Sequence, residues 1–177
     1  MNLWWVLLLL AAERGLEMLI ARHNRQVLLR KGAKEFYPES FRAIVTMHGF
    51  FFIALVFEGY PWRVPLDVLT WACLIALVLL QLLRYWCIVS LGRFWNTRII
   101  VLPGAGVQKR GPYRWLRHPN YLVVTLEFLF LPLLFRAPLT LLVFTLANLA
   151  LLRRRIALEE KALGENTDYR SRFEEKK

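Results

Sequence analysis

Five apolar segments, each long enough to form a helix, dominate this sequence. A helix rises 1.5 Å per residue, so about 20 apolar residues cross a hydrocarbon core of roughly 30 Å. Hydrophobic residues make up 57% of the chain, a share typical of membrane proteins rather than of ordinary soluble domains. We therefore predict an all-α fold, a polytopic membrane helix bundle of about five transmembrane helices, formed by residues 3–21, 41–57, 66–89, 121–135 and 138–152.

The last two segments form a hairpin whose tip carries Arg136. They are shorter than the first three and could form a re-entrant loop instead of two spans. A re-entrant tip would place the guanidinium of Arg136 deep in the bilayer, at a cost of several kcal/mol. We therefore expect two spans, extended at their polar ends.

Lys and Arg alternate between the loops. They crowd the first loop, the third loop and the C-terminal tail, whereas the second and fourth loops carry only Arg63 and Arg136. Because basic residues mark cytoplasmic loops, this distribution predicts an outside N-terminus and a cytoplasmic C-terminus. The same rule accounts for the net charge of +11 without a polyanionic partner, so we expect no nucleic acid to bind. Length and composition fit a single integral membrane domain, residues 1–177.

Ionisable residues interrupt three of the predicted spans. Glu13, Arg14 and Glu17 lie in the first, His48 in the second and Arg84 in the third. Such groups are costly in lipid and usually face the interior of a bundle or a cavity. This cost favours an internal ion-pair set, which holds the helices together, over a substrate site.

The cysteines and glycines indicate neither a metal site nor a dinucleotide fold. Cys73 and Cys87 share one apolar stretch and lack the spacing of metal ligands, so we expect no metal. Gly104, Gly106 and Gly111 do not have GxGxxG spacing or a strand–turn–helix context, which excludes a Rossmann domain. The glycines indicate turns instead.

The third loop ends in the segment RHPNY, residues 117–121. Pro119 suits the first turn of a helix, which places His118 at or beside the helix N-terminus, where free N–H groups favour anionic or hydrogen-bond-accepting ligand groups. Tyr113 and Tyr121 add aromatic faces that end in hydroxyls. The same residue types also form interfacial belts that anchor membrane proteins, so the residues alone leave a ligand site and an anchor equally open.

A second polar cluster follows the last apolar segment. Arg155 and Glu159 are four residues apart, so on a continuous helix they share one face and can pair. Taken alone, such a pair is more often structural and contributes little.

The two clusters together resemble the isoprenylcysteine carboxyl methyltransferase family, which is related to the phospholipid methyltransferases. The matching residues are GPYRWLRHPNY at 111–121, the hairpin that follows, RIALEE at 155–160 and GENTDYRSRF at 164–173. The N-terminal half looks like bacterial members of the family. The resemblance implies a protein of the bacterial inner membrane, with three spans in residues 1–90 and a cofactor-binding loop, a helical hairpin and a C-terminal helix in residues 91–177.

The resemblance also implies that S-adenosylmethionine binds in a pocket at the cytoplasmic face. Arg155 and Glu159 would be the catalytic residues, with Arg155 facing the acceptor and Glu159 also contacting the cofactor. The other implied cofactor contacts are Val107, Gln108, Tyr113, His118, Pro119, Asn120 and Tyr121.

The activity implied is O-methylation of a lipophilic small molecule or a lipidated acceptor in the membrane. We place a phenolic, quinone-type or pyrone-type hydroxyl ahead of an isoprenylcysteine-type carboxylate, with His118 as a candidate base. Glu127 could bind such a hydroxyl or could pair internally with Arg84 or Arg14. An NADPH-dependent membrane reductase and a non-catalytic membrane scaffold are the alternative functions.

Overall fold

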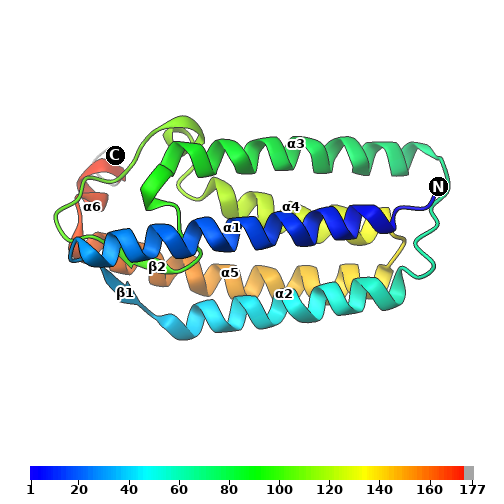
Figure 1. Ribbon diagram of the computed structural model, residues 1–177, viewed down its shortest axis with the longest axis horizontal. Coiled ribbons are helices and arrows are strands. Elements are labelled where there is room, and N and C mark those ends of the chain that lie inside the picture. Colours follow the sequence, from blue (N-terminus) through cyan, green and yellow to red (C-terminus); the bar gives the residue numbers. More distant parts are fainter. Residues whose placement is uncertain (174–177) are drawn as a thin grey trace.

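The computed structural model describes residues 1–173 and is mostly helical (Figure 1). Each predicted apolar segment falls almost entirely within one long helix, which confirms these five segments as helices. The long helices are α1 (Trp4–Arg30), α2 (Pro38–Glu58), α3 (Val68–Leu91), α4 (Pro119–Leu134) and α5 (Pro138–Asn166). The shorter elements are β1 (Lys34–Phe36), η1 (Gly92–Phe94), β2 (Ile99–Val101), η2 (Gly111–Arg114) and α6 (Tyr169–Phe173).

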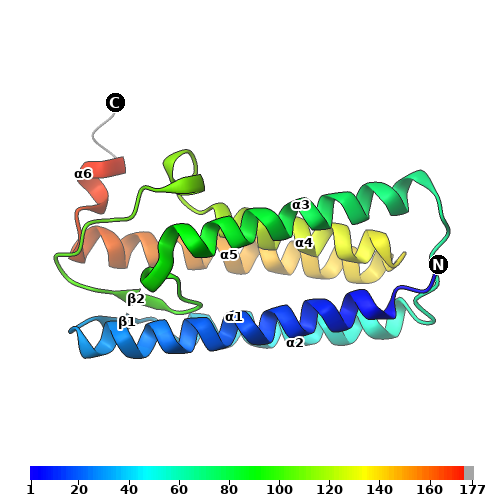
Figure 2. The same cartoon turned by 45° about the horizontal axis from the view of Figure 1, so that its top comes forward.

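The long helices run alongside one another, so the connections gather at the two ends of the bundle (Figures 1 and 2). The α1–α2 connection, the long α3–α4 connection and the end of α5 share one end. The N-terminus and the other two connections share the opposite end. The basic loops that were predicted to face the same side of a membrane therefore do lie together.

Among the described residues, two helices are long and apolar enough to cross a membrane, Pro38–Glu58 and Val68–Phe94. α4 is apolar but has only 16 residues, and α1 and α5 carry charged residues within their length. Many large apolar side chains nevertheless point outward, as a surface in contact with lipid requires. Examples that are more than half exposed are Leu8, Phe57, Val78, Val89 and Leu142. The number of spans and their orientation stay predictions.

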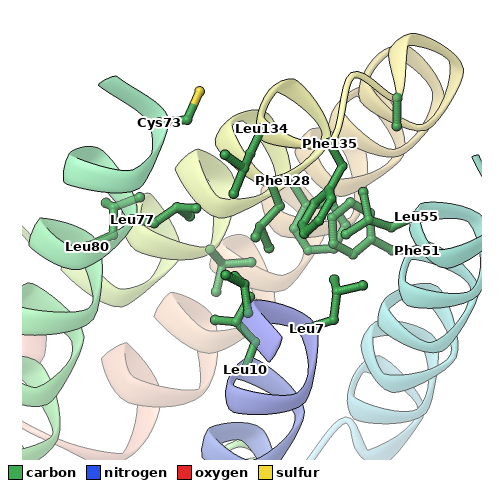
Figure 3. Packing of buried hydrophobic residues seen from close by; sticks show 14 of the residues in the cluster. Leu7, Leu10, Phe51, Leu55, Cys73, Leu77, Leu80, Phe128, Leu134 and Phe135 are labelled. Carbon is green, nitrogen blue, oxygen red and sulfur yellow. The ribbon is translucent and has the colours of Figure 1, made fainter. Parts of the chain in front are cut away.

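The apolar core fills the centre of the bundle (Figure 3). Phe51 of α2 stacks on Phe128 of α4, with ring centroids 4.0 Å apart. Leu10 of α1 and Leu77 of α3 are buried in the same cluster. The core thus joins helices from both halves of the chain and fixes α4 relative to α2 and α3.

A buried ion-pair network crosses the bundle beside this core. Glu17 binds Arg14 at 2.8 Å and Arg84 at 3.2 Å, and Glu127 binds Arg14 at 3.0 Å and also pairs with Arg84. Two guanidinium groups and two carboxylates balance their charge, which buried ions require. The predicted internal ion-pair set is confirmed for Arg14, Glu17 and Arg84 and includes Glu127. Glu13 lies outside it and accepts a hydrogen bond from the Tyr85 hydroxyl at 2.7 Å. His48 lies outside this network and bonds to a backbone carbonyl of its own helix at 2.9 Å.

The α1–α2 and α3–α4 connections are joined by a two-stranded antiparallel sheet, β1 and β2. This sheet corrects the all-α prediction, because strands of three residues are too short to show an alternating pattern in the sequence. Glu35 of β1 binds Arg25 at 2.9 Å and Arg98 at 2.6 Å. Partial burial raises the pKa of Glu35, but hydrogen bonds from both guanidinium groups outweigh it and hold that pKa below its usual value.

Candidate functional site

A pocket opens at the basic end of the bundle. Its walls are formed by β2 and the loop that follows it, by the start of α4, by the end of α5, and by α6. The space it encloses, including open solvent at its mouth, is about 1060 Å³. The structure brings seven of the predicted cofactor residues to its wall: Val107, Gln108, Tyr113, His118, Asn120, Tyr121 and Glu159.

The start of α4 forms one side of this pocket. The helix begins at Pro119 with His118 as its N-cap residue, as the RHPNY segment predicted. Pro119 itself is buried and starts the helix rather than lining the pocket. The His118 ring stacks on Tyr121, with centroids 5.3 Å apart, and its Nε2 atom lies 3.1 Å from a carboxylate oxygen of Glu160. In the first turn, the N–H groups of Tyr121 and Leu122 both donate to the carbonyl of His118. The imidazole therefore lies at the positive end of the α4 dipole.

Glu160 is fixed from two sides. Besides His118, the Tyr169 hydroxyl of α6 donates to the carboxylate of Glu160 at 2.9 Å. Partial burial raises the pKa of Glu160, but these hydrogen bonds outweigh it, so the pKa lies below its ordinary value. Burial also raises the pKa of Tyr169, which keeps its hydroxyl protonated as the donor. The ionised carboxylate therefore ties α4, α5 and α6 together at the pocket.

The hydroxyl of Tyr121 connects the two residues predicted to be catalytic. It accepts a hydrogen bond from Nε of Arg155 at 2.9 Å and donates to a carboxylate oxygen of Glu159. Arg155 and Glu159 do lie on one continuous helix, α5. No direct ion pair joins them within residues 1–173, so the expected Arg–Glu pair is replaced by a bridge through Tyr121.

Arg155 is 5% exposed and has further partners on two other segments. Its Nη1 atom donates to the Ser40 hydroxyl at 3.1 Å, and its Nη2 atom donates to the carbonyl of Thr97 at 2.6 Å. Arg155 lines a smaller groove of about 330 Å³ between α2 and α5. The guanidinium therefore stands between this groove and the larger pocket, where Glu159 lies.

The loop that carries Val107 is closed by the C-terminal segment. The N–H of Val107 donates to Asp168 at 2.7 Å, and Arg172 of α6 binds the same carboxylate at 2.5 Å. The hydrogen bond from Val107 and the pair with Arg172 hold the pKa of Asp168 below its usual range. Sequence reasoning placed Asp168 in a matching motif but gave it no role, because only the fold brings it to this loop.

Glu127 does not lie at this pocket. Its carboxylate is occupied by Arg14, Arg84 and the side-chain amide of Gln81, which donates to it at 3.0 Å. These contacts account for its burial at 6% exposure. The predicted contact of Glu127 with an acceptor stays a prediction.

Residues 72–165 match the isoprenylcysteine carboxyl methyltransferase family. This range contains the RHPNY segment, Tyr121, Arg155 and Glu159, which meet in the structure. The chain belongs to this family. Family membership indicates a membrane methyltransferase and confirms the resemblance described from the motifs.

Two further proteins are similar over most of their length. The "Uncharacterized protein YpbQ" of Bacillus subtilis is 43% identical over 164 residues, which cover 92% of this chain and 96% of that protein. An "Uncharacterized protein" of Haemophilus influenzae is 25% identical over 154 residues, or 86% of this chain and 90% of that protein. No solved structure matches the chain significantly.

The residues present at the pocket fit S-adenosylmethionine, the methyl donor of this family. The ligand carries positive charge on its sulfonium and amino groups, and Glu159 supplies a carboxylate. The positive end of the α4 dipole suits its carboxylate. Its purine needs flat apolar contacts and neutral hydrogen-bonding groups, which Trp95 and Asn96 offer in the pocket wall. Sequence reasoning missed these last two residues.

Proposed function

We propose that this protein is an S-adenosylmethionine-dependent O-methyltransferase that acts on a lipophilic acceptor from the membrane. The observation that carries the proposal is the bridge through Tyr121. It connects Glu159, in the wall of the large pocket, to Arg155, in the wall of the groove between α2 and α5. A methyltransferase needs two such adjoining spaces, one for the donor and one for the acceptor.

S-adenosylmethionine, when bound, supplies an electrophilic methyl group attached to a sulfonium. Glu159, His118 and Gln108 would hold it in the large pocket. Tyr121 fixes the carboxylate of Glu159, and Asp168 fixes the loop that leads to Gln108. These residues therefore orient the donor before the acceptor arrives, which lowers the entropic cost of aligning the two reactants.

Arg155 is suited to hold the reacting oxygen of the acceptor. A guanidinium has five N–H donors, and the contacts with Tyr121, Ser40 and Thr97 use three of them. The other two lie on the Nη atoms and can bind an anionic oxygen. Because Arg155 is fixed from three sides and stays charged, it would hold that oxygen in one orientation.

The groove between α2 and α5 is suited to a lipophilic acceptor. Ala43, Ile44, Leu151 and Leu158 give it apolar walls, and Arg155 gives it a cationic wall. We propose that the acceptor is a phenol, quinone precursor or pyrone, ahead of an isoprenylcysteine-type carboxylate. A carboxylate is already ionised, whereas a phenol or enol must lose its proton. The cation of Arg155 would favour the oxyanion, and His118 would be the base.

We further propose that the site faces the cytoplasm of a bacterial inner membrane, since the pocket lies at the basic end of the bundle. S-adenosylmethionine would then reach it from water, and the acceptor would reach it from the bilayer.

The cofactor choice separates this function from a membrane reductase. NADPH carries a 2′-phosphate that needs free basic side chains, but the two arginines in the pocket wall are paired, Arg98 with Glu35 at 2.6 Å and Arg117 with Glu160 at 3.7 Å. The test is calorimetric titration of the purified protein with S-adenosylmethionine and with NADPH. We expect binding of S-adenosylmethionine alone. Binding of NADPH alone would refute the proposal, and a folded protein that binds neither would support a non-catalytic scaffold.

A further inference from the structure

Three residues that line the large pocket carry buried side-chain polar groups that lack hydrogen-bond partners within residues 1–173. These groups are the indole N–H of Trp95, both ends of the Asn96 amide and the side-chain oxygen of Asn120. Trp95 is 3% exposed, so bulk water does not reach its ring. Folded proteins contain few such unpaired groups, because each is costly to bury. Three at one pocket indicate a ligand that pairs with them.

The backbone around these groups is already fixed by other contacts. The side chain of Asn24 donates to the carbonyl of Trp95 at 2.9 Å and to that of Gly92 at 3.1 Å. Arg155 donates to the carbonyl of Thr97 at 2.6 Å. The segment is therefore held on both sides of Asn96 without help from the Asn96 side chain, which leaves this amide available to a ligand.

The chemistry of the three groups indicates which part of a ligand they bind. All are neutral, and together they offer donors and acceptors. Arg98, the ionic residue of the same segment in the pocket wall, is paired with Glu35 at 2.6 Å, and Glu159 and His118 lie on other segments. An asparagine amide matches the edge of adenine, accepting from the 6-amino group and donating to a ring nitrogen. Phe94 and Ile99, which line the same pocket, add apolar surface for the faces of a purine.

We propose that Asn96, together with Trp95 and Asn120, binds the edge of the adenine ring of the cofactor. This inference rests on the proposed function and adds the residues that recognise the nucleoside end. It gives the large pocket two regions, a neutral one for the base and an ionic one around Glu159 for the amino-acid end.

The test is the variant Asn96→Leu, which has a similar volume and no polar atoms. Its dissociation constants for S-adenosylhomocysteine and for 5′-methylthioadenosine, which lacks the amino-acid end, are measured by calorimetry. We expect both to rise by about tenfold or more, since two hydrogen bonds are lost. The melting temperature without ligand should stay the same or rise, because an unpaired buried amide is removed. The matched control is Asn2→Leu, an exposed position at the opposite end of the bundle, which should change neither constant.

The two ligands separate the possible failures. A loss for S-adenosylhomocysteine but not for 5′-methylthioadenosine would place Asn96 at the amino-acid end and refute the inference. Unchanged binding of both ligands by Asn96→Leu would also refute it and leave the proposed function intact. If the wild-type protein bound neither ligand, the proposed function itself would fail.

A base-modified ligand gives an independent measurement. An analogue of 5′-methylthioadenosine without the 6-amino group should bind the wild type more weakly, whereas Asn96→Leu should not distinguish it from the parent compound. A variant that still distinguishes the two by the wild-type factor would show that Asn96 does not contact the base.

Discussion

The variant Tyr121→Phe removes one hydroxyl and with it the bridge between Arg155 and Glu159. Two hydrogen bonds to charged groups are lost. Water can replace the one to Glu159, whose side chain is 28% exposed, but not the one to Arg155, which is 5% exposed. A hydrogen bond to a buried charged group is worth about 1.5–3 kcal/mol, so we expect a loss of about 2 kcal/mol in the free energy of unfolding. For a chain of this size that lowers the melting temperature by about 4–8 °C.

The effect on methyl transfer should be larger than the effect on folding. Without the hydroxyl, Arg155 keeps Ser40 and Thr97 as partners but loses its link to Glu159. The donor and acceptor spaces are then no longer held relative to each other, and we expect the turnover number to fall by about tenfold or more, with little change in cofactor affinity. In a double-mutant cycle on the turnover number, Tyr121→Phe and Glu159→Gln should show a coupling energy of about 1 kcal/mol or more.

Unfolding can be followed with the protein's own cysteines. Cys73 and Cys87 are both free and 0% exposed, so a thiol-reactive dye labels them only when the bundle opens. The matched control is Tyr85→Phe, which removes an exposed hydroxyl bonded to Glu13 and should change the melting temperature by less than about 2 °C. Equal melting temperatures and equal turnover for Tyr121→Phe and wild type would refute the bridging role.

Four further variants test other parts of the account. Glu127→Gln removes one carboxylate from the buried Arg84 and the partly buried Arg14 and should lower the free energy of unfolding by about 3 kcal/mol in the thiol-labelling assay. A stable variant with altered acceptor choice would instead indicate a contact with the acceptor. The pKa of Asp168 is held below its ordinary value of 3.8, so the carboxylate holds the cofactor loop fully above that pH and releases it as the pH falls through the lowered pKa. Titration calorimetry should therefore show no change in the cofactor dissociation constant from Asp168 between about pH 5 and pH 8. Asp168→Asn should bind the cofactor about threefold more weakly. Gly111→Ala should fold poorly, because its Cβ would collide with the Ser90 hydroxyl and lie 2.9 Å from the indole nitrogen of Trp86, both on α3. Gly104→Ala meets no atom within 4 Å and should lose only about 1 kcal/mol for its positive φ, so equal yields and melting temperatures for the two variants would contradict this.

The parts of the fold that follow from local patterns were predictable. Apolar runs gave the five long helices, and Pro119 gave the start of α4. Spacing placed Arg155 and Glu159 on one helix. In each case the physical cause lies within a few residues along the chain, so the sequence contains the signal.

Contacts between distant segments were not predictable from these patterns. Val107 and Asp168 are 61 residues apart, and Arg155 reaches Ser40 over 115 residues. A direct pair between Arg155 and Glu159 was the simplest expectation, but a tyrosine from another helix stands between them. Asn96 looked like an ordinary loop residue because an unpaired amide is recognised only when its surroundings are known. The Tyr121 bridge and the unpaired Asn96 amide both depend on tertiary packing, which the periodicity of apolar residues in the sequence does not predict.

Methyl transfer to a lipophilic acceptor from the membrane is the central claim, and its most direct test is transfer of a labelled methyl group. The purified protein is incubated with methyl-labelled S-adenosylmethionine and total lipid from its own cells, and the organic extract is analysed for labelled product. We predict one labelled lipophilic product that disappears with Glu159→Gln, while Tyr85→Phe retains it. A folded protein that leaves the extract unlabelled, or that labels it equally with Glu159→Gln, would contradict the account.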